Sequence, residues 1–192
     1  MLPDPLVLAT HNPGKLAEWR ALLASEVHQL TDAPTLGLPA PDETEPTFRC
    51  NALLKAFAAA RAAGQPALGE DAGIEVHRLA GAPGVQTKRT LAPHGDWCGG
   101  VRALLDQLGT AEAACDYVAA LAIAWPDGRW VTAHGSVPGH LVPPRGEGPG
   151  LAPTFRPLGQ DATWAELGAA WRADNDHRAA ALEELRAVLS AD

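Results

Sequence analysis

Two adjacent acids lie in the stretch Leu68-Gly69-Glu70-Asp71-Ala72-Gly73-Ile74, directly after a short apolar run. The small residues after them, and the alternating run that begins at Ile74, predict a strand that breaks into a tight turn before a second strand. Adjacent carboxylates repel each other, so burying both is costly unless a metal ion or a lysine neutralises them. We therefore expect a cation beside Glu70 and Asp71, and a solvated acidic turn is the alternative.

A lysine suited to this position is Lys55, in the alanine-rich segment before the acids. Residues 48–63 predict a helix, with Thr47 as its N-cap and Gly64 near its end. Asn51 and Lys55 are one helical turn apart and share a face. An amide, an ammonium group and two carboxylates would suit Mg²⁺ and phosphate, because Mg²⁺ takes few carboxylates and leaves positions for phosphate oxygens.

A second candidate anion site follows the apolar run at residues 5–9. The turn Thr10-His11-Asn12-Pro13-Gly14-Lys15 precedes a segment with helical spacing from residue 16 to 24. This order places the N–H groups of a helix start beside Lys15, which suits phosphate. The turn is not a P-loop, because the first glycine of GxxxxGK[ST] is absent and Leu16 replaces the Ser or Thr. A simple helix cap is the alternative.

The rest of the chain alternates helices with short apolar strands, which indicates an α/β protein with a mixed sheet. The expected elements are a parallel strand at 27–31, a helix at 101–108, a hairpin of strands 117–125 and 129–136 around Pro126-Asp127-Gly128, and helices at 162–171 and 179–189. Residues 137–158 are rich in glycine and proline, so we expect a loop there and a candidate lid.

Composition excludes several classes of function. The 192 residues, 46% of them apolar, suit one domain or two lobes that share a sheet. No apolar run could span a bilayer, and the N-terminus does not resemble a signal peptide. Three widely spaced cysteines favour reduced thiols in the cytoplasm over structural zinc. The net charge of −8 argues against non-specific binding to nucleic acid.

Six ordered motifs resemble those of the inosine triphosphate pyrophosphatases, the family that clears dITP, ITP and XTP. The matching segments are residues 10–15, 43–56, 70–74, 81–89, 134–139 and 176–178. The resemblance implies an elongated mixed central sheet flanked by helices, within a single domain over residues 1–192, and two lobes with an active-site cleft between them. It also implies a cytoplasmic homodimer that requires Mg²⁺ and cleaves nucleoside triphosphates into a monophosphate and pyrophosphate.

The resemblance further implies a role for each matching residue. Asp71 would accept a proton from the attacking water and, with Glu43, bind Mg²⁺, while Lys55 and Glu70 would complete the catalytic group. Residues 10–15 would hold the phosphates, and the base would meet three side chains near the C-terminus. The implied substrate-binding residues are Thr10, His11, Asn12, Pro13, Gly14, Lys15, Asn51, Ala72, Arg89, Arg172, His177 and Arg178.

The chain departs from the family pattern mainly in the loop that covers the base. Pro149 and Leu151 replace aromatic residues, and Ala152 replaces an aspartate. Stacking and a polar anchor are both reduced, so we expect altered or relaxed base selectivity. The alternatives are a nucleotide-binding protein without catalysis and a hydrolase of another phosphorylated metabolite. The presence of Lys55 and Asp71 argues against loss of catalysis.

Overall fold

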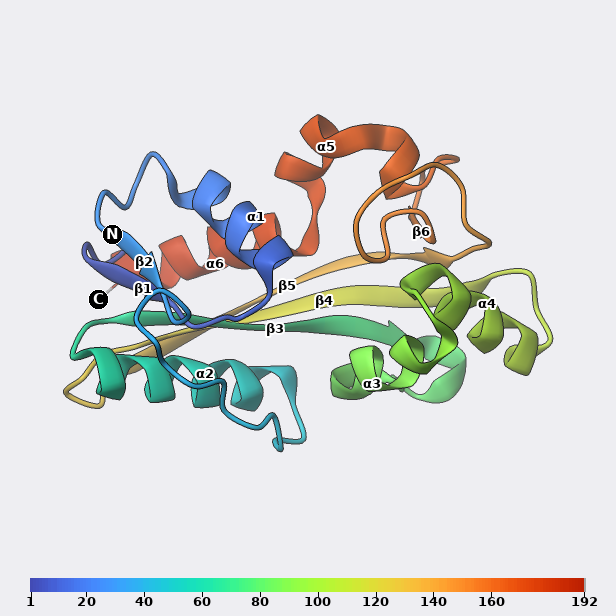
Figure 1. The fold of residues 1–192 in the computed structure, drawn as a ribbon. Coiled ribbons are helices and arrows are strands. Elements are labelled where there is room, and N and C mark those ends of the chain that lie inside the picture. Colours follow the sequence, from blue (N-terminus) through green and yellow to red (C-terminus); the bar gives the residue numbers. More distant parts are fainter. Residues whose placement is uncertain (192) are drawn as a thin grey trace. The chain divides into compact units, whose positions relative to one another are not determined.

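The computed structural model describes residues 1–191 and shows a mixed α/β fold (Figure 1). The strands are β1 (Leu6–Leu8), β2 (Leu30–Asp32), β3 (Ala67–Val76), β4 (Ala113–Ala124), β5 (Trp130–Leu141) and β6 (Phe155–Pro157). They form a six-stranded sheet in the order β2-β1-β3-β4-β5-β6. β1 pairs in parallel with β2 and β3, whereas β6 pairs antiparallel with β5. The mixed sheet predicted from the sequence is therefore confirmed.

Helices flank the sheet, and three single-turn 3₁₀ segments connect some of the elements. The helices are α1 (Pro13–Leu23), α2 (Phe48–Ala63), α3 (Thr87–Leu91), α4 (Trp97–Leu108), α5 (Trp164–Asn175) and α6 (His177–Ala191). The prediction for α2 is confirmed at both ends. The Thr47 hydroxyl accepts a hydrogen bond from the Cys50 N–H at 3.2 Å, and Gly64 ends the helix with a φ of 66°.

The predicted turn at Glu70 and Asp71 is wrong, because β3 runs without a break from residue 67 to 76. Consecutive side chains of a strand point to opposite faces of the sheet. The two acids therefore lie on different faces, and each has a lysine within 3.3 Å. This arrangement separates the two carboxylates, and each has the neighbouring cation that their repulsion led us to expect.

Other boundaries also differ from the predictions. The expected loop at 137–158 is partly wrong, because β5 extends to Leu141 and residues 155–157 form β6. Helix α4 begins at Trp97, earlier than predicted, because the Asp96 carboxylate accepts the Gly99 N–H and caps it. The expected hairpin is present, and its turn is closed by a hydrogen bond from the Trp125 N–H to the Arg129 carbonyl at 2.9 Å.

Contacts divide the chain into two compact units. Unit 1 comprises Met1–Asp71, Ala119–Gly135 and Ala181–Asp192, and unit 2 comprises Ala72–Val118 and Ser136–Ala180. The core of unit 2 gathers around Phe155 and Trp164. All three cysteines are free, as predicted. None of the helices in residues 1–191 is both long and apolar enough to cross a membrane. The cleft expected between two lobes stays a prediction.

Candidate active site

A close approach of β3 to α2 positions the first cluster of charged side chains, in unit 1. Gly69 makes this approach possible, since a Cβ atom there would lie only 2.2 Å from the Ala52 carbonyl oxygen and 2.8 Å from the Ala56 nitrogen. Only glycine fits between the two backbones without a shift. Asp71 lies two residues further along β3, on the same face, and therefore faces the side of α2 that carries Lys55.

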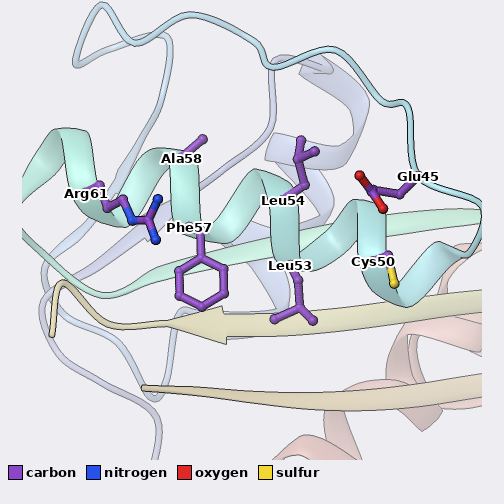
Figure 2. A pocket seen from close by; sticks show the side chains of 7 residues that line it. All are labelled: Glu45, Cys50, Leu53, Leu54, Phe57, Ala58 and Arg61. Atoms are coloured by element: carbon purple, nitrogen blue, oxygen red, sulfur yellow. The ribbon is translucent and has the colours of Figure 1, made fainter. Parts of the chain in front are cut away.

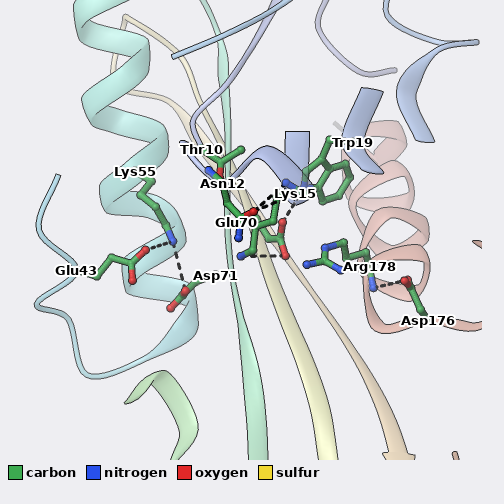
Figure 3. Close-up of polar contacts among 11 residues, drawn as sticks. Thr10, Asn12, Lys15, Trp19, Glu43, Lys55, Glu70, Asp71, Asp176 and Arg178 are labelled. Atoms are coloured by element: carbon green, nitrogen blue, oxygen red, sulfur yellow. Dashed lines mark hydrogen bonds and ion pairs between the residues drawn. The ribbon is translucent and has the colours of Figure 1, made fainter. Parts of the chain in front are cut away.

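Lys55 joins two carboxylates at the surface of unit 1 (Figure 3). Its Nζ donates to Glu43 Oε1 at 2.7 Å and to Asp71 Oδ1 at 3.3 Å. The side chains of Lys55 and Asp71 are each 10% exposed, whereas that of Glu43 is 44% exposed. The structure thus brings together three predicted site residues that are separated by 12 and 16 positions in the sequence.

Asp71 is held in an unusual electrostatic state. Burial raises the pKa of its carboxyl above the ordinary value, and the charges of Lys55 and Lys15 oppose this rise only in part. Its Oδ2 atom is buried and has no hydrogen-bond partner within residues 1–191. A buried carboxylate oxygen without a protein donor is available to a metal ion or to a water molecule.

Asn51 fastens the loop that carries Glu43. Its Oδ1 accepts the Glu45 N–H at 3.0 Å, and its Nδ2 donates to the Glu45 carbonyl at 3.2 Å. These two bonds fix the loop backbone at Glu45, two residues after Glu43. Asn51 makes them from α2, one helical turn before Lys55. Asn51 therefore positions a predicted metal ligand, and its contact with substrate stays a prediction.

Glu70 lies on the opposite face of β3, toward α1 (Figures 1 and 3). Its Oε1 lies 3.3 Å from Lys15 Nζ, and its Oε2 accepts a hydrogen bond from Trp19 Nε1 at 2.6 Å. Glu70 and Trp19 are almost fully buried. Each of the two acids thus has its own lysine, Lys15 for Glu70 and Lys55 for Asp71.

The predicted phosphate segment, residues 10–15, forms the start of α1. Its polar side chains shape the segment itself, and Pro13 occupies the first helical turn, where a missing N–H costs nothing. The hydrogen bonds are Asn12 Oδ1 with the N–H of Gly14 at 2.9 Å and of Lys15 at 3.4 Å, Thr10 Oγ1 with the Asn12 N–H at 3.2 Å, and His11 Nε2 with the Leu38 carbonyl at 2.8 Å. Contact with phosphate stays a prediction for this segment.

The predicted base-reading residues lie at the junction of α5 and α6, in unit 2. Asp176 caps α6, because its Oδ1 accepts the N–H groups of Arg178 and Ala179, each at 2.9 Å. Its Oδ2 lies 3.7 Å from a guanidinium nitrogen of Arg172. One aspartate therefore orders both the helix start and the side chain of Arg172.

His177 lies inside an aromatic stack. Its ring is fully buried and lies 4.0 Å from the Tyr117 ring, at an interplanar angle of 18°. Trp164 continues the stack at 5.1 Å from Tyr117, and the Arg172 guanidinium lies 5.2 Å from the Trp164 ring. The stack holds His177 by contacts on its ring, so contact with a base stays a prediction that needs access to this ring.

The remaining predicted residues are dispersed in unit 2. Arg89 is exposed on α3 and donates to Gln86 at 3.2 Å, and Ala72 is half-buried on β3. In the variant loop, Leu151 and Ala152 are buried in the core around Trp164, whereas Pro149 is exposed. The loop thus uses two positions for packing where the family pattern has an aromatic residue and an acid.

A pocket of about 420 Å³ lies along α2 (Figure 2). Its lining residues are Glu45, Cys50, Leu53, Leu54, Phe57, Ala58 and Arg61. Neither Lys55 nor Asp71 lines it. The lining is largely apolar and lacks a cluster of catalytic groups. The candidate site is therefore the Lys55 cluster, which consists of Glu43, Lys55 and Asp71.

Two contributing residues were not predicted from the sequence, Trp19 and Tyr117. Trp19 contacts an acid 51 positions away, and Tyr117 stacks on a histidine in another element. Trp19 looked like one more apolar position of α1, and its spacing of four residues from Lys15 was the one available signal. No sequence signal pointed to Tyr117.

The residues present fit a magnesium ion. Within residues 1–191 no group of three or more His, Cys, Asp or Glu side chains is arranged to hold a metal. Mg²⁺ is commonly bound by one or two carboxylates, with phosphate oxygens and water as its other ligands. Glu43 and Asp71 supply two carboxylates that meet at Lys55, and Asp71 Oδ2 has no protein donor among the described residues.

Comparison with known proteins identifies the family of this chain. Residues 6–188 match the Ham1 family. The chain is 44% identical to a dITP/XTP pyrophosphatase of Rhodospirillum centenum, over 96% of this chain and 94% of that one. It is 43% identical to the enzyme of the same name from Caulobacter vibrioides, over 96% and 97% of the two chains.

Solved structures give the same result. A HAM1 protein from Coxiella burnetii matches with a TM-score of 0.86 and 30% identity, over 100% of both chains. A nucleoside-triphosphatase, also described as a dITP/XTP pyrophosphatase, from Mycobacterium abscessus matches with a TM-score of 0.71 and 32% identity, over 95% and 97% of the chains. From its fold, its sequence match and these relatives, the chain belongs to the Ham1 family.

Proposed function

We propose that this chain is a Mg²⁺-dependent nucleoside triphosphate pyrophosphatase. It converts dITP, XTP and similar nucleotides into the monophosphate and pyrophosphate. The observation that carries the proposal is the buried Lys55, bonded to Glu43 at 2.7 Å and to Asp71 at 3.3 Å. The names of the relatives, dITP/XTP pyrophosphatases, support the substrate class.

Glu43 and Asp71 would hold the metal ion, and substrate oxygens and water would supply its other ligands. When bound, Mg²⁺ neutralises the negative charge of phosphate oxygens. Asn51 keeps Glu43 in reach by fixing the backbone at Glu45. Lys55 lies between the two carboxylates and stabilises the charge that develops on the departing phosphate.

Asp71 accepts the proton of the attacking water. The water oxygen forms a new bond to the α phosphorus. The bond from this phosphorus to the oxygen that bridges the α and β phosphates breaks, and pyrophosphate leaves. Burial raises the pKa of Asp71, which makes the carboxylate a better proton acceptor than an exposed aspartate. Phosphoryl transfer needs little else from the protein, since positioning and charge stabilisation dominate its catalysis.

The substrate is held by the two groups of residues already described. Lys15, with residues 10–14, binds the phosphates at the start of α1, where N–H groups favour anions. Arg172, His177 and Arg178 read the base, and their donors favour the 6-oxo group of hypoxanthine, xanthine or guanine. Base selectivity is relaxed, because Pro149, Leu151 and Ala152 offer neither a stacking ring nor a carboxylate.

The protein acts as a cytoplasmic homodimer. Light scattering measures its molar mass in solution and so tests the dimer.

The test is pyrophosphate release from dITP, XTP, dGTP, dATP and dTTP, with Mg²⁺ and with a chelator. We expect release to require Mg²⁺ and to fall by at least about a hundredfold in Asp71→Asn, because an amide cannot accept the proton. Asp106→Asn is the matched control, since Asp106 is an exposed carboxylate on α4. Wild-type rates in Asp71→Asn, or binding of nucleotides without release, would contradict the proposal.

A further inference from the structure

A buried indole donates a hydrogen bond to the acid that pairs with Lys15 (Figure 3). Trp19 Nε1 lies 2.6 Å from Glu70 Oε2, and Lys15 Nζ lies 3.3 Å from Glu70 Oε1. Trp19 is 1% exposed and Glu70 is 2% exposed, so both are shielded from water. The side chain of Lys15 is 19% exposed and reaches the surface from this buried pair.

The three side chains form one geometric unit. Trp19 and Lys15 are four residues apart on α1, so they share a face of the helix. Each takes a different oxygen of the Glu70 carboxylate. The indole can only donate, and it carries no charge, so it fixes the rotation of the carboxylate without competing for the ammonium group. The other carboxylate oxygen, Oε1, faces the ammonium group of Lys15.

This arrangement restricts a side chain that is otherwise flexible. An unrestrained lysine loses rotamer entropy when it is fixed, and ordering it before the ligand binds removes this loss from the binding step. Glu70 has one more methylene group than an aspartate, and this group carries its carboxylate further from β3. The indole N–H of Trp19 donates a hydrogen bond to the carboxylate in this position.

We infer that Trp19 is a positioning residue for phosphate binding. It holds Glu70 so that the ammonium group of Lys15 is ordered at the start of α1 before the nucleotide arrives. The inference rests on the proposed function, since it assigns Lys15 to the phosphates. A purely structural role for Trp19 would affect stability alone, whereas a positioning role acts through Lys15.

The experiment is a double-mutant cycle of Trp19→Phe and Lys15→Met. Two quantities are measured for each protein, the KM and kcat for dITP with Mg²⁺ and the Kd for inorganic tripolyphosphate by calorimetry. We expect Trp19→Phe to raise KM and Kd by about five- to tenfold and to change kcat by less than about twofold, since the lost interaction is one of binding. In the Lys15→Met background, Trp19→Phe should add no further change, because interacting residues are not additive.

Two more variants separate positioning from loss of packing. Leu23→Ala is the control, because Leu23 is fully buried on the same helix and makes no polar contact with the site. It should lower the melting temperature and leave KM unchanged. Glu70→Asp withdraws the acceptor while keeping the indole, so it should raise KM as Trp19→Phe does even if the latter folds poorly.

The outcomes are distinct. An unchanged KM and Kd in Trp19→Phe, or the same increase in both backgrounds, would overturn the inference while wild-type turnover still supports the proposed function. A wild-type protein that releases no pyrophosphate contradicts the proposed function, and the tripolyphosphate cycle then decides the role of Trp19 by itself.

Discussion

At the scale of single residues, the site places ionisable side chains where water is largely excluded. Asp71 and Lys55 are nearly buried, yet Glu43 beside them is accessible. Burial raises the pKa of Asp71, and the neighbouring carboxylate of Glu43 raises it further, although Lys55 and Lys15 lower it. The fold therefore makes the charged form of Asp71 less favourable than that of an exposed aspartate, while the proposed catalysis requires the charged form.

The first prediction concerns the stability of Asp71→Asn without metal. Because the pKa of Asp71 is raised on folding, its contribution to stability is fully present below the unfolded-state pKa and is lost as the pH rises through the folded-state value. Asparagine resembles the protonated acid. We therefore expect Asp71→Asn to melt at a higher temperature than the wild type at pH 8, in a chelator.

The difference should shrink as the pH falls below the raised pKa of Asp71, where the wild type is also protonated. Melting curves from pH 4 to pH 8 measure this, with Asp106→Asn as the exposed control. Added Mg²⁺ should stabilise the wild type more than the variant, because the variant has lost a ligand. A variant that is less stable at pH 8 in chelator would show that the pairing with Lys55 outweighs the cost of burial.

At the scale of elements, the contact of β3 with α2 depends on one glycine. We predict that Gly69→Ala destabilises the fold by about 1–3 kcal/mol, because the added methyl group must separate the two backbones. Activity should fall as well, since Lys55 is on α2 and Asp71 is on β3. Chemical denaturation and kcat for dITP measure the two effects.

Gly148→Ala is a stability control for this variant. A Cβ atom at residue 148 would lie 3.3 Å from the methyl group of Ala152, a contact that a shift of a few tenths of an ångström relieves, whereas a Cβ atom at Gly69 would meet backbone at 2.2 Å. Gly148→Ala should therefore lower the free energy of unfolding much less than Gly69→Ala. Equal losses in the two variants would mean that any added methyl group is harmful, and the close approach at Gly69 would not explain the result.

Much of the arrangement of elements could be predicted from local patterns. Helix α2 has a Thr cap and a Gly end, and the hairpin turn has Pro, Asp and Gly, so a few neighbouring residues determine each element. The continuity of β3 could not be predicted, because the small residues after Asp71 have the local pattern of a turn, and the lysines beside the two acids lie on two other elements. The extension of β5 to Leu141 is stabilised by its pairing with β6, a contact between distant segments.

At the scale of the whole molecule, the chain matches the family pattern at the predicted catalytic residues and departs from it in the loop predicted to cover the base. The Lys55 cluster was predicted because its residues match the family pattern one by one. Trp19 and the buried position of His177 were not, because each depends on partners that are distant in the sequence. A sequence names the charged residues of a site more readily than the uncharged ones that position them.

The third prediction concerns selectivity among nucleotides. With Leu151 and Ala152 in the core and Pro149 exposed, the loop supplies neither a ring nor an acid for the base. Each lost hydrogen bond reduces discrimination by about 1–3 kcal/mol, a factor of about ten to a hundred. We expect dITP to be preferred to dGTP by less than about a thousandfold in kcat/KM, which is about 4 kcal/mol. A larger ratio would contradict relaxed selectivity.

The alternation along β3 also makes the site sensitive to chain length. A residue inserted or deleted next to Gly69 would exchange the faces of Glu70 and Asp71, because a shift by one position turns every side chain of a strand over. Each acid would then face the wrong helix, although the composition of the segment would hardly change. In a library of single-residue insertions, we expect activity to vanish at residues 67–71 and to survive in the turn at 126–128. The site thus depends on whether an odd or an even number of residues precedes each acid in β3, as well as on the residues themselves.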